Sequence, residues 1–210
     1  EGTVARYVLA TSGDAGTHKR GITREDLARV RESEQRAAAQ VAGVNDVVFL
    51  GYPDGEVEVT LALRRDIVRE IRRFKPDTVI CFDPTRLFFG DGYINHPDHR
   101  AAATAALDAT FPAAGQPNLF QDLEEEGFKA HKPRKVYVTS WDGADVFVNI
   151  EETIDVKVSA LRAHKSQMKD WDPDERIRQW AAERGKGKEM AYAEGFRVVT
   201  LVDDETWQKR

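Results

Sequence analysis

Residues 78–110 read TVICFDPTRLFFGDGYINHPDHRAAATAALDAT and contain the pattern that most clearly indicates the fold class. The apolar run from Thr78 to Phe82 has the length and β-branched content of a buried strand, which ends at Asp83-Pro84. The alanine-rich residues 97–110 form a helix pattern, and Pro97 is a favoured first helical residue. This segment therefore predicts a strand, a polar loop and a helix, in that order.

The same alternation precedes this segment. Strands are predicted over residues 4–11 (VARYVLAT) and 46–50 (DVVFL), and helices over residues 23–43 and 60–74. Thr23 with Asp26 approximates a capping box, and Gly43 stops the first helix. Strand, loop and helix repeated in this way predict βαβ units and a parallel sheet of the α/β class.

The second half of the chain is less regular. Residues 111–133 predict an irregular excursion with one short helix. Strands are expected over 135–140, 145–150 and 196–202, the first two as an antiparallel pair, and helices over 152–164 and 172–184. Because the chain shows no internal repeat and no linker, we expect a single domain over residues 1–210.

Three polar loops follow predicted strands, at residues 12–17, 51–55 and 83–99. In open parallel sheets, ligands bind beyond the carboxyl ends of the strands. We therefore expect these three loops to meet at one sheet edge and to form the functional site.

The third loop ends in Asn95-His96-Pro97-Asp98-His99-Arg100. His96 and His99 are three residues apart, so in a first helical turn they lie on the same side. One imidazole could bind a divalent metal while the other works beside it, held by Asp98. The alternative is a solvated helix start with accidental histidines, and two histidines alone do not complete a metal site.

Composition narrows the class of protein. The 210 residues are 41% hydrophobic and 32% charged, an ordinary balance for a globular protein, and the net charge of −5 argues against general affinity for nucleic acid or anionic membranes. Cys81 is the only cysteine, so no intramolecular disulfide forms, which fits a cytoplasmic location. No apolar run reaches the ~18 residues of a membrane span.

The motifs TSGDAGT, FLGYPDGEV, KPDTVICFDP, NHPDHRAA and ALRAHKSQ follow one another in an order that resembles the LmbE-like family, the same family as the PIG-L type de-N-acetylases. The resemblance covers almost the whole chain. It implies a Rossmann-like α/β fold with a mostly parallel sheet flanked by helices. It also implies a zinc-dependent hydrolase that removes acyl groups, usually acetyl, from amino sugars or related amines.

The resemblance assigns roles to particular residues. His99 matches a metal ligand, and His96 and Asp98 match catalytic positions, where His96 stabilises the oxyanion or protonates the departing amine and Asp98 orients it. Asp14, Arg31 and Asp54 match positions that hold sugar hydroxyls. For these three, local turn hydrogen bonds or a simple ion pair are the alternative explanation.

The chain departs from the family pattern at its start. Family members begin with a strand, an AHPDDE-like loop and a helix, which supply a histidine and an aspartate to the metal; no such string occurs here. Two explanations remain open. Either the first strand and helix belong to a part not included in this sequence, which we favour, or the protein is an inactive binding or scaffold module without a complete metal site.

The cofactor expected from the resemblance is Zn²⁺, although histidine and aspartate ligands also suit iron or cobalt. The expected partner is a small amino-sugar or amide substrate, and family members often form homo-oligomers. Other enzyme classes lack their signatures, because SGDAGT is not GxGxxG and no GxSxG elbow is present.

Overall fold

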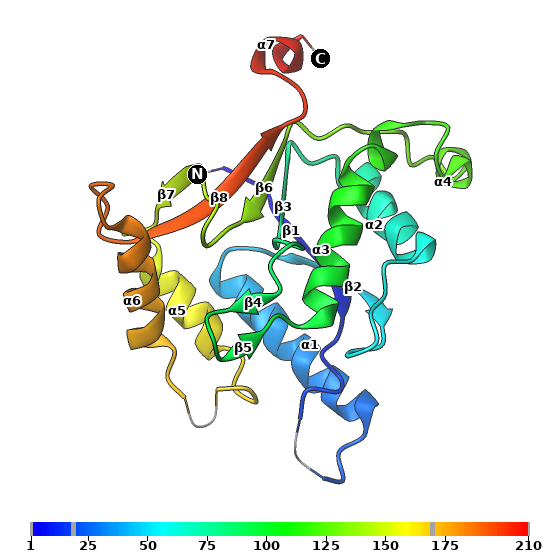
Figure 1. Cartoon of the computed structure of the whole chain (residues 1–210). Coiled ribbons are helices and arrows are strands. Elements are labelled where there is room, and N and C mark those ends of the chain that lie inside the picture. Colours follow the sequence, from blue (N-terminus) through cyan, green and yellow to red (C-terminus); the bar gives the residue numbers. More distant parts are fainter. Residues whose placement is uncertain (1, 18–19, 169–170, 210) are drawn as a thin grey trace. The chain divides into compact units, whose positions relative to one another are not determined.

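The computed structural model describes residues 2–17, 20–168 and 171–209. Its helices and strands alternate through the first half of the chain, as predicted (Figure 1). In chain order the elements are β1 (Arg6–Thr11), α1 (Arg24–Val41), β2 (Asp46–Tyr52), α2 (Leu61–Phe74), β3 (Thr78–Cys81), β4 (Phe88–Phe89), β5 (Tyr93–Ile94), α3 (Pro97–Thr110), η1 (Ala113–Gly115), α4 (Gln121–Glu125), β6 (Lys135–Thr139), β7 (Val146–Asn149), α5 (Ile154–Arg162), α6 (Asp174–Gly185), β8 (Ala193–Thr200) and α7 (Asp204–Gln208).

The chain forms two compact units that interleave in sequence. The first consists of Glu1–Glu56 and Phe147–Gly195, and the second of Val57–Val146 and Phe196–Arg210. The expected α/β class is confirmed, because each unit combines strands with helices. The single domain over residues 1–210 stays a prediction.

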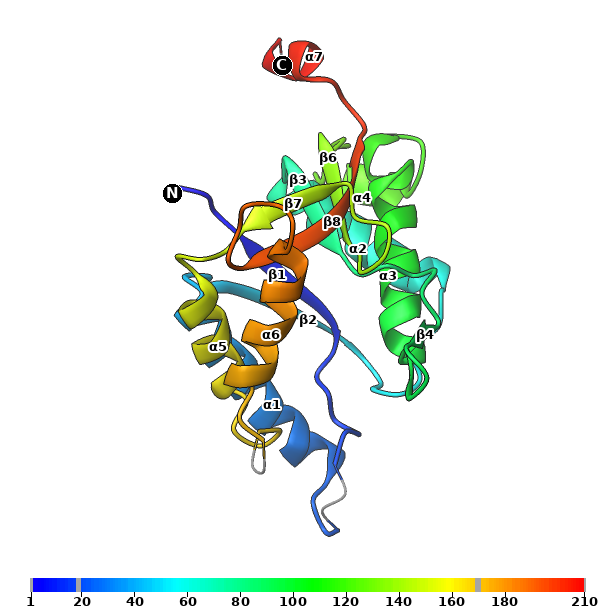
Figure 2. The same cartoon turned by 60° about the vertical axis from the view of Figure 1, so that its left-hand side comes forward.

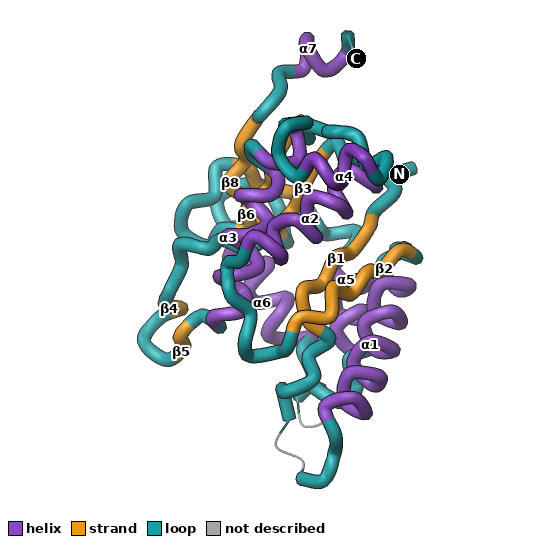
Figure 3. Tube along the Cα trace, turned by 90° about the vertical axis from the view of Figure 1, so that its right-hand side faces the viewer, coloured by secondary structure: helices purple, strands orange, loops and turns teal. Residues whose placement is uncertain are grey.

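In the first unit, β1 and β2 pair in parallel, with Arg6 opposite Asp46 (Figure 3). Helix α1 begins where the sequence predicts, because the Thr23 hydroxyl accepts a hydrogen bond from the Asp26 amide at 3.1 Å. Gly43 follows the helix with a φ of +77°, a conformation that favours glycine. A small core joins the end of α1 to both strands: Ala39, Val44 and Val47, with Leu9 and Phe49 packed against them.

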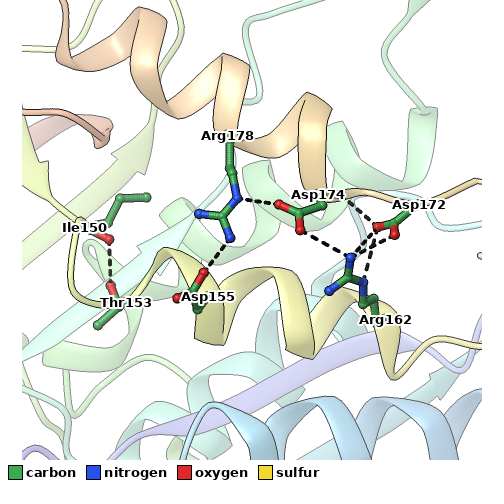
Figure 4. Close-up of polar contacts among 7 residues, drawn as sticks. All are labelled: Ile150, Thr153, Asp155, Arg162, Asp172, Asp174 and Arg178. Carbon is green, nitrogen blue, oxygen red and sulfur yellow. Dashed lines mark hydrogen bonds and ion pairs between the residues drawn. The ribbon is translucent and has the colours of Figure 1, made fainter.

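Helices α5 and α6 belong to the same unit and lie side by side (Figure 2). Five charged side chains link them (Figure 4). Arg162 lies 2.8 Å from Asp172 and 3.2 Å from Asp174, and Arg178 bonds both Asp155 and Asp174. Because these groups are largely exposed, the network orients the two helices more than it stabilises them.

In the second unit, β3 pairs in parallel with β6, and β6 pairs antiparallel with β8. The sheet order is β3-β6-β8-β7. The predicted antiparallel pairing of residues 135–140 with 145–150 is therefore wrong, because β8 lies between these two strands. The described strands form three sheets, including the short β4–β5 hairpin.

Helices α2 and α3 pack against each other in the second unit (Figure 1). Their shared core contains Val68, Ile71 and Ala109, and it extends to the irregular segment predicted for 111–133. That segment contains η1 and the short α4, in agreement with the prediction of one short helix. Among the described residues, no helix is both long and apolar enough to cross a membrane.

Candidate active site

The histidine-containing loop ends where α3 begins. His96 is the N-cap of α3, Pro97 is its first residue, and Asp98 places a carboxylate in the first turn. Each of these three residues favours a helix start at this point. His96 accepts a hydrogen bond from a free backbone amide, proline loses nothing by lacking an N–H in the first turn, and the Asp98 carboxylate suits the positive end of the helix dipole. The predicted start of this helix at residue 97 is confirmed.

The capping bond also determines which nitrogen of His96 carries a proton. The amide of Asp98 donates to His96 Nδ1 at 3.2 Å, so Nδ1 is an acceptor. In neutral His96 the proton is then on Nε2. The His96 side chain is 43% exposed, so this N–H can reach a ligand.

Asp98 holds His96 differently from the expectation. Its carboxylate oxygen Oδ1 lies 3.8 Å from His96 Nδ1, too far for a hydrogen bond although close enough for attraction to a charged imidazole. The same oxygen accepts a bond from the Val57 amide at 3.3 Å, and Asp98 is only 6% exposed. The backbone amide of Asp98, rather than its carboxylate, makes the hydrogen bond to His96.

His99 lies beside His96, as the three-residue spacing predicts. The two ring centroids are 5.4 Å apart. The His99 ring also stacks on the Phe82 ring. Their centroids are 5.3 Å apart, and the ring planes are inclined by 25°. Phe82 directly follows β3, so the end of this strand supports the histidine pair.

A second group of predicted residues comes together in the first unit, where the loops 12–17 and 51–55 meet. Asp14 Oδ1 accepts from the amide of Asp54 at 3.0 Å. Asp54 in turn accepts from the amide of Ala15 at 3.1 Å through Oδ2. The expectation that these two loops meet is confirmed. Loop 83–99 belongs to the second unit, and its meeting with the other two loops stays a prediction.

Arg31 completes this group from the middle of α1. Its Nη2 donates to the carbonyl of Gly16 at 2.7 Å. Its Nε is buried and has no hydrogen-bond partner among the described residues. A buried donor without a partner costs free energy, but Arg64, Arg86, Arg100 and Arg134 also have such a nitrogen, so this feature alone does not mark a ligand site.

The described residues do not by themselves fit a zinc ion. No group of three or more histidine, cysteine, aspartate or glutamate side chains in residues 2–17, 20–168 and 171–209 is arranged to hold a metal. His96 and His99 are the nearest approach to one, and Asp98 is engaged with Val57. A catalytic zinc site usually has three protein ligands.

Cys81 is not available as an alternative nucleophile. Burial, with a smaller contribution from the charge of Asp83, raises the pKa of the Cys81 thiol to about 11. The thiol is therefore protonated at neutral pH, which suits a packing residue better than a nucleophile.

Sequence reasoning missed three residues around these groups. Phe82 was assigned only to a strand, and Arg24 was not singled out, although an arginine in the first turn of a helix opposes the helix dipole and is a usable signal. The third is His164, which follows α5 and whose imidazole interacts electrostatically with Glu34 and Arg31.

The environment of His164 predicts a pH effect on stability. Burial, and the charge of Arg31, lower the pKa of His164 below its ordinary 6.5, although Glu34 opposes this. Below about pH 6.5 the unfolded chain then binds more protons at this site than the folded chain, so this contribution favours unfolding as the pH falls. We expect thermal midpoints between pH 7.5 and 5 to fall more steeply for the wild type than for His164→Gln. Equal slopes would contradict the assignment.

Comparisons with known proteins agree with the family resemblance. Residues 1–110 match the model of the PIG-L family, described as GlcNAc-PI de-N-acetylase. The diacetylchitobiose deacetylase of Thermococcus kodakarensis is 32% identical over 198 residues, which cover 92% of this chain and 71% of the relative. The probable N-acetyl-alpha-D-glucosaminyl L-malate deacetylase 2 of Bacillus anthracis is 30% identical over 168 residues, with 77% and 67% coverage.

Solved structures show the same relationship. The N,N'-diacetylchitobiose deacetylase of Pyrococcus horikoshii superposes with a TM-score of 0.84 at 26% identity, over 95% of this chain and 74% of that one. The family to which this chain belongs is therefore the PIG-L, or LmbE-like, family. A 4-carboxy-2-hydroxymuconate hydratase from Pseudomonas putida shares the fold, with a TM-score of 0.74 at 21% identity, 95% coverage of this chain and 85% of that one. The fold alone therefore does not specify deacetylation.

Proposed function

We propose that this protein removes an N-acetyl group from an amino sugar or an N-acetylglucosaminyl conjugate by hydrolysis. The observation that carries the proposal is the histidine pair in the first turn of α3, with His96 and His99 5.4 Å apart at ring centroids. Its support is that the two relatives compared above are named as deacetylases of acetylated amino sugars.

His96 is proposed as the group that handles a proton. Its Nδ1 is held by the Asp98 amide, so Nε2 faces the substrate as a donor. From there the N–H of neutral His96 stabilises negative charge on the carbonyl oxygen by a hydrogen bond. To donate a proton to the departing amine, His96 must first be protonated at Nδ1, which breaks the bond from the Asp98 amide. Asp98 assists by fixing the imidazole and by placing a negative charge 3.8 Å from Nδ1.

Substrate binding is proposed for the group formed by Asp14, Arg31 and Asp54, in which Arg31 and Asp54 contact the substrate. Arg31 has a buried N–H without a described partner. An ionised carboxylate has about four lone-pair positions, so Asp54 can accept a sugar hydroxyl besides its bonds to Ala15 and Thr11. This combination of a charged donor and a charged acceptor suits hydroxyl and acetamido groups better than apolar ligands.

Zinc is the proposed cofactor, with His99 as one ligand, and iron or cobalt are alternatives of similar ligand preference. Since the described residues contain no group of three ligands, no reaction step is assigned to the metal. The second candidate function is a non-catalytic binding or scaffold module of the same family.

One experiment separates the two candidates. Protein expressed from the complete reading frame is incubated with N,N'-diacetylchitobiose, N-acetylglucosamine and N-acetylglucosaminyl malate, with zinc, iron(II) or cobalt(II). The deacetylase proposal expects acetate and primary amine in equal amounts from at least one substrate. No amine from any combination, with a folded protein that still binds these sugars, would favour the binding module.

Arg31 provides a graded test of substrate binding. We expect Arg31→Met to lower kcat/KM roughly 10–150-fold, mainly through KM, because hydrogen bonds to charged groups contribute about 1.5–3 kcal/mol. The matched control is Arg29→Met on the same helix, whose side chain is 72% exposed and forms an ion pair with Asp26. Equal effects of the two substitutions on KM would refute a binding role for Arg31.

A cytoplasmic location and self-association are further parts of the proposal. The first rests on the single cysteine, and the second on the family resemblance. Fractionation of cells and sedimentation of the purified protein test them separately.

A further inference from the structure

The Asp14 carboxylate is fully engaged by groups of the protein itself. Oδ1 accepts from the Asp54 amide at 3.0 Å, and Oδ2 accepts from Arg24 Nε at 2.5 Å. Partial burial raises the pKa of Asp14, but these bonds outweigh it and hold the pKa below its ordinary value. The side chain is 17% exposed, which leaves little of it for a ligand.

Arg24 binds the backbone carbonyl of Asp54, the residue whose amide donates to Asp14. Its Nη2 donates to the carbonyl of Asp54 at 3.0 Å, and its Nη1 lies 3.0 Å from a carboxylate oxygen of Glu56. The planar guanidinium therefore spans three acceptors at fixed angles, which a lysine could not do. Between them, Asp14 and Arg24 bind both the N–H and the C=O of Asp54.

The position of Arg24 is unfavourable for the helix itself. It is the first residue of α1, where the helix dipole favours anions, and a cation there is destabilising by a few tenths of a kcal/mol. Its bonds to Asp14 and Asp54 account for a cation at this position.

The Asp54 side chain, by contrast, accepts its two hydrogen bonds from uncharged groups. Thr11 Oγ1 donates to Oδ1 at 3.4 Å and the Ala15 amide to Oδ2 at 3.1 Å. The next residue, Gly55, has a φ of +87°, a left-handed conformation that glycine adopts readily in a turn.

We propose that Arg24 and Asp14 are positioning residues that clamp the backbone of Asp54 and thereby aim its carboxylate at an amino-sugar hydroxyl. This inference rests on the proposed function and deepens it: Asp14 acts through Asp54 instead of contacting the substrate. Because misplacement by ~1 Å can cost 10²-fold in rate, loss of either residue should lower kcat/KM about 10–100-fold, mainly through KM.

The test combines Asp14→Ala, Arg24→Met and Asp54→Ala, with Arg24→Lys as a partial rescue and Arg29→Met as the control. If Asp14 and Arg24 act through Asp54, each lowers kcat/KM in the wild type but changes it less than about twofold in the Asp54→Ala background. A persistent loss for Asp14→Ala in that background would overturn the proposal, because Asp14 would then contact the substrate directly.

Amide hydrogen exchange tests the clamp without any turnover. Asp14→Ala and Arg24→Met should speed exchange at the amide of Asp54, and Arg29→Met should not. Unchanged protection at Asp54 would overturn the clamp even if the enzyme is active. If the wild type releases no amine but the exchange result holds, the proposed function fails while the clamp stands, and binding of N-acetylglucosamine oligosaccharides to the same variants then decides its role.

Discussion

Arg72→Met should destabilise the second unit by about 3–5 kcal/mol, the cost of breaking a buried charged network by removing one partner. The Arg72 side chain is completely buried. Its guanidinium donates to five backbone carbonyls of one segment, those of Ala113, Ala114, Gln116, Leu119 and Phe120, at 2.8–3.4 Å. Methionine fills the volume but leaves these carbonyls without their donor.

Urea and thermal unfolding measure the effect, which should lower the midpoint by roughly 6–20 °C. The control is Lys209 of the same unit, since its side chain is 70% exposed and pairs with the exposed Glu205 at 2.6 Å, so Lys209→Met should cost under about 1 kcal/mol. Similar losses for the two variants would show that the carbonyl cluster contributes nothing special. Hydrogen exchange over residues 113–128 should rise only in Arg72→Met.

Arg72 also shows where sequence reasoning stops. The apolar positions of α2 predict its buried side through residues such as Val68 and Ile71, both of which are in the core. Periodicity cannot predict a buried arginine, because its partners are carbonyls of an irregular segment some forty residues later. The carbonyls of that segment come within hydrogen-bond distance of the guanidinium only when the segment has folded around it.

Strand pairing failed for a related reason. Residues 135–140 and 145–150 are adjacent in sequence, and neighbouring strands pair about two-thirds of the time. Here β8, from the end of the chain, lies between β6 and β7. Local patterns therefore predict where the strands are. The order of the strands in the sheet depends on pairing between segments that are far apart in the sequence.

The candidate site was more predictable than the sheet. Local rules place His96 and His99 on one helical turn, and the rule for parallel strands brings Asp14 near Asp54. Local rules do not predict which atoms make the hydrogen bonds within each group. The Asp98 amide, rather than its carboxylate, bonds His96, and Arg24 supports a residue thirty positions away.

Replacement of His99 by alanine should have the largest effect on activity. If His99 is a metal ligand, His99→Ala should lower kcat/KM by more than the roughly 10–100-fold that loss of a supporting residue around a metal costs. Metal content should fall in parallel, because each ligand contributes to affinity. Both are measured on the same preparation, by elemental analysis and by release of acetate from N,N'-diacetylchitobiose.

Two further variants distinguish ligation from a general structural effect. Phe82→Leu removes the ring that stacks on His99 at 5.3 Å but keeps the imidazole, so it should retain metal and lose activity less severely. His131→Ala removes another histidine of the second unit, one that bonds the Pro76 carbonyl at 2.8 Å, and should leave both readouts near the wild-type level. If His99→Ala kept its metal and its turnover while remaining folded, His99 would not be a ligand and the histidine pair would need another explanation.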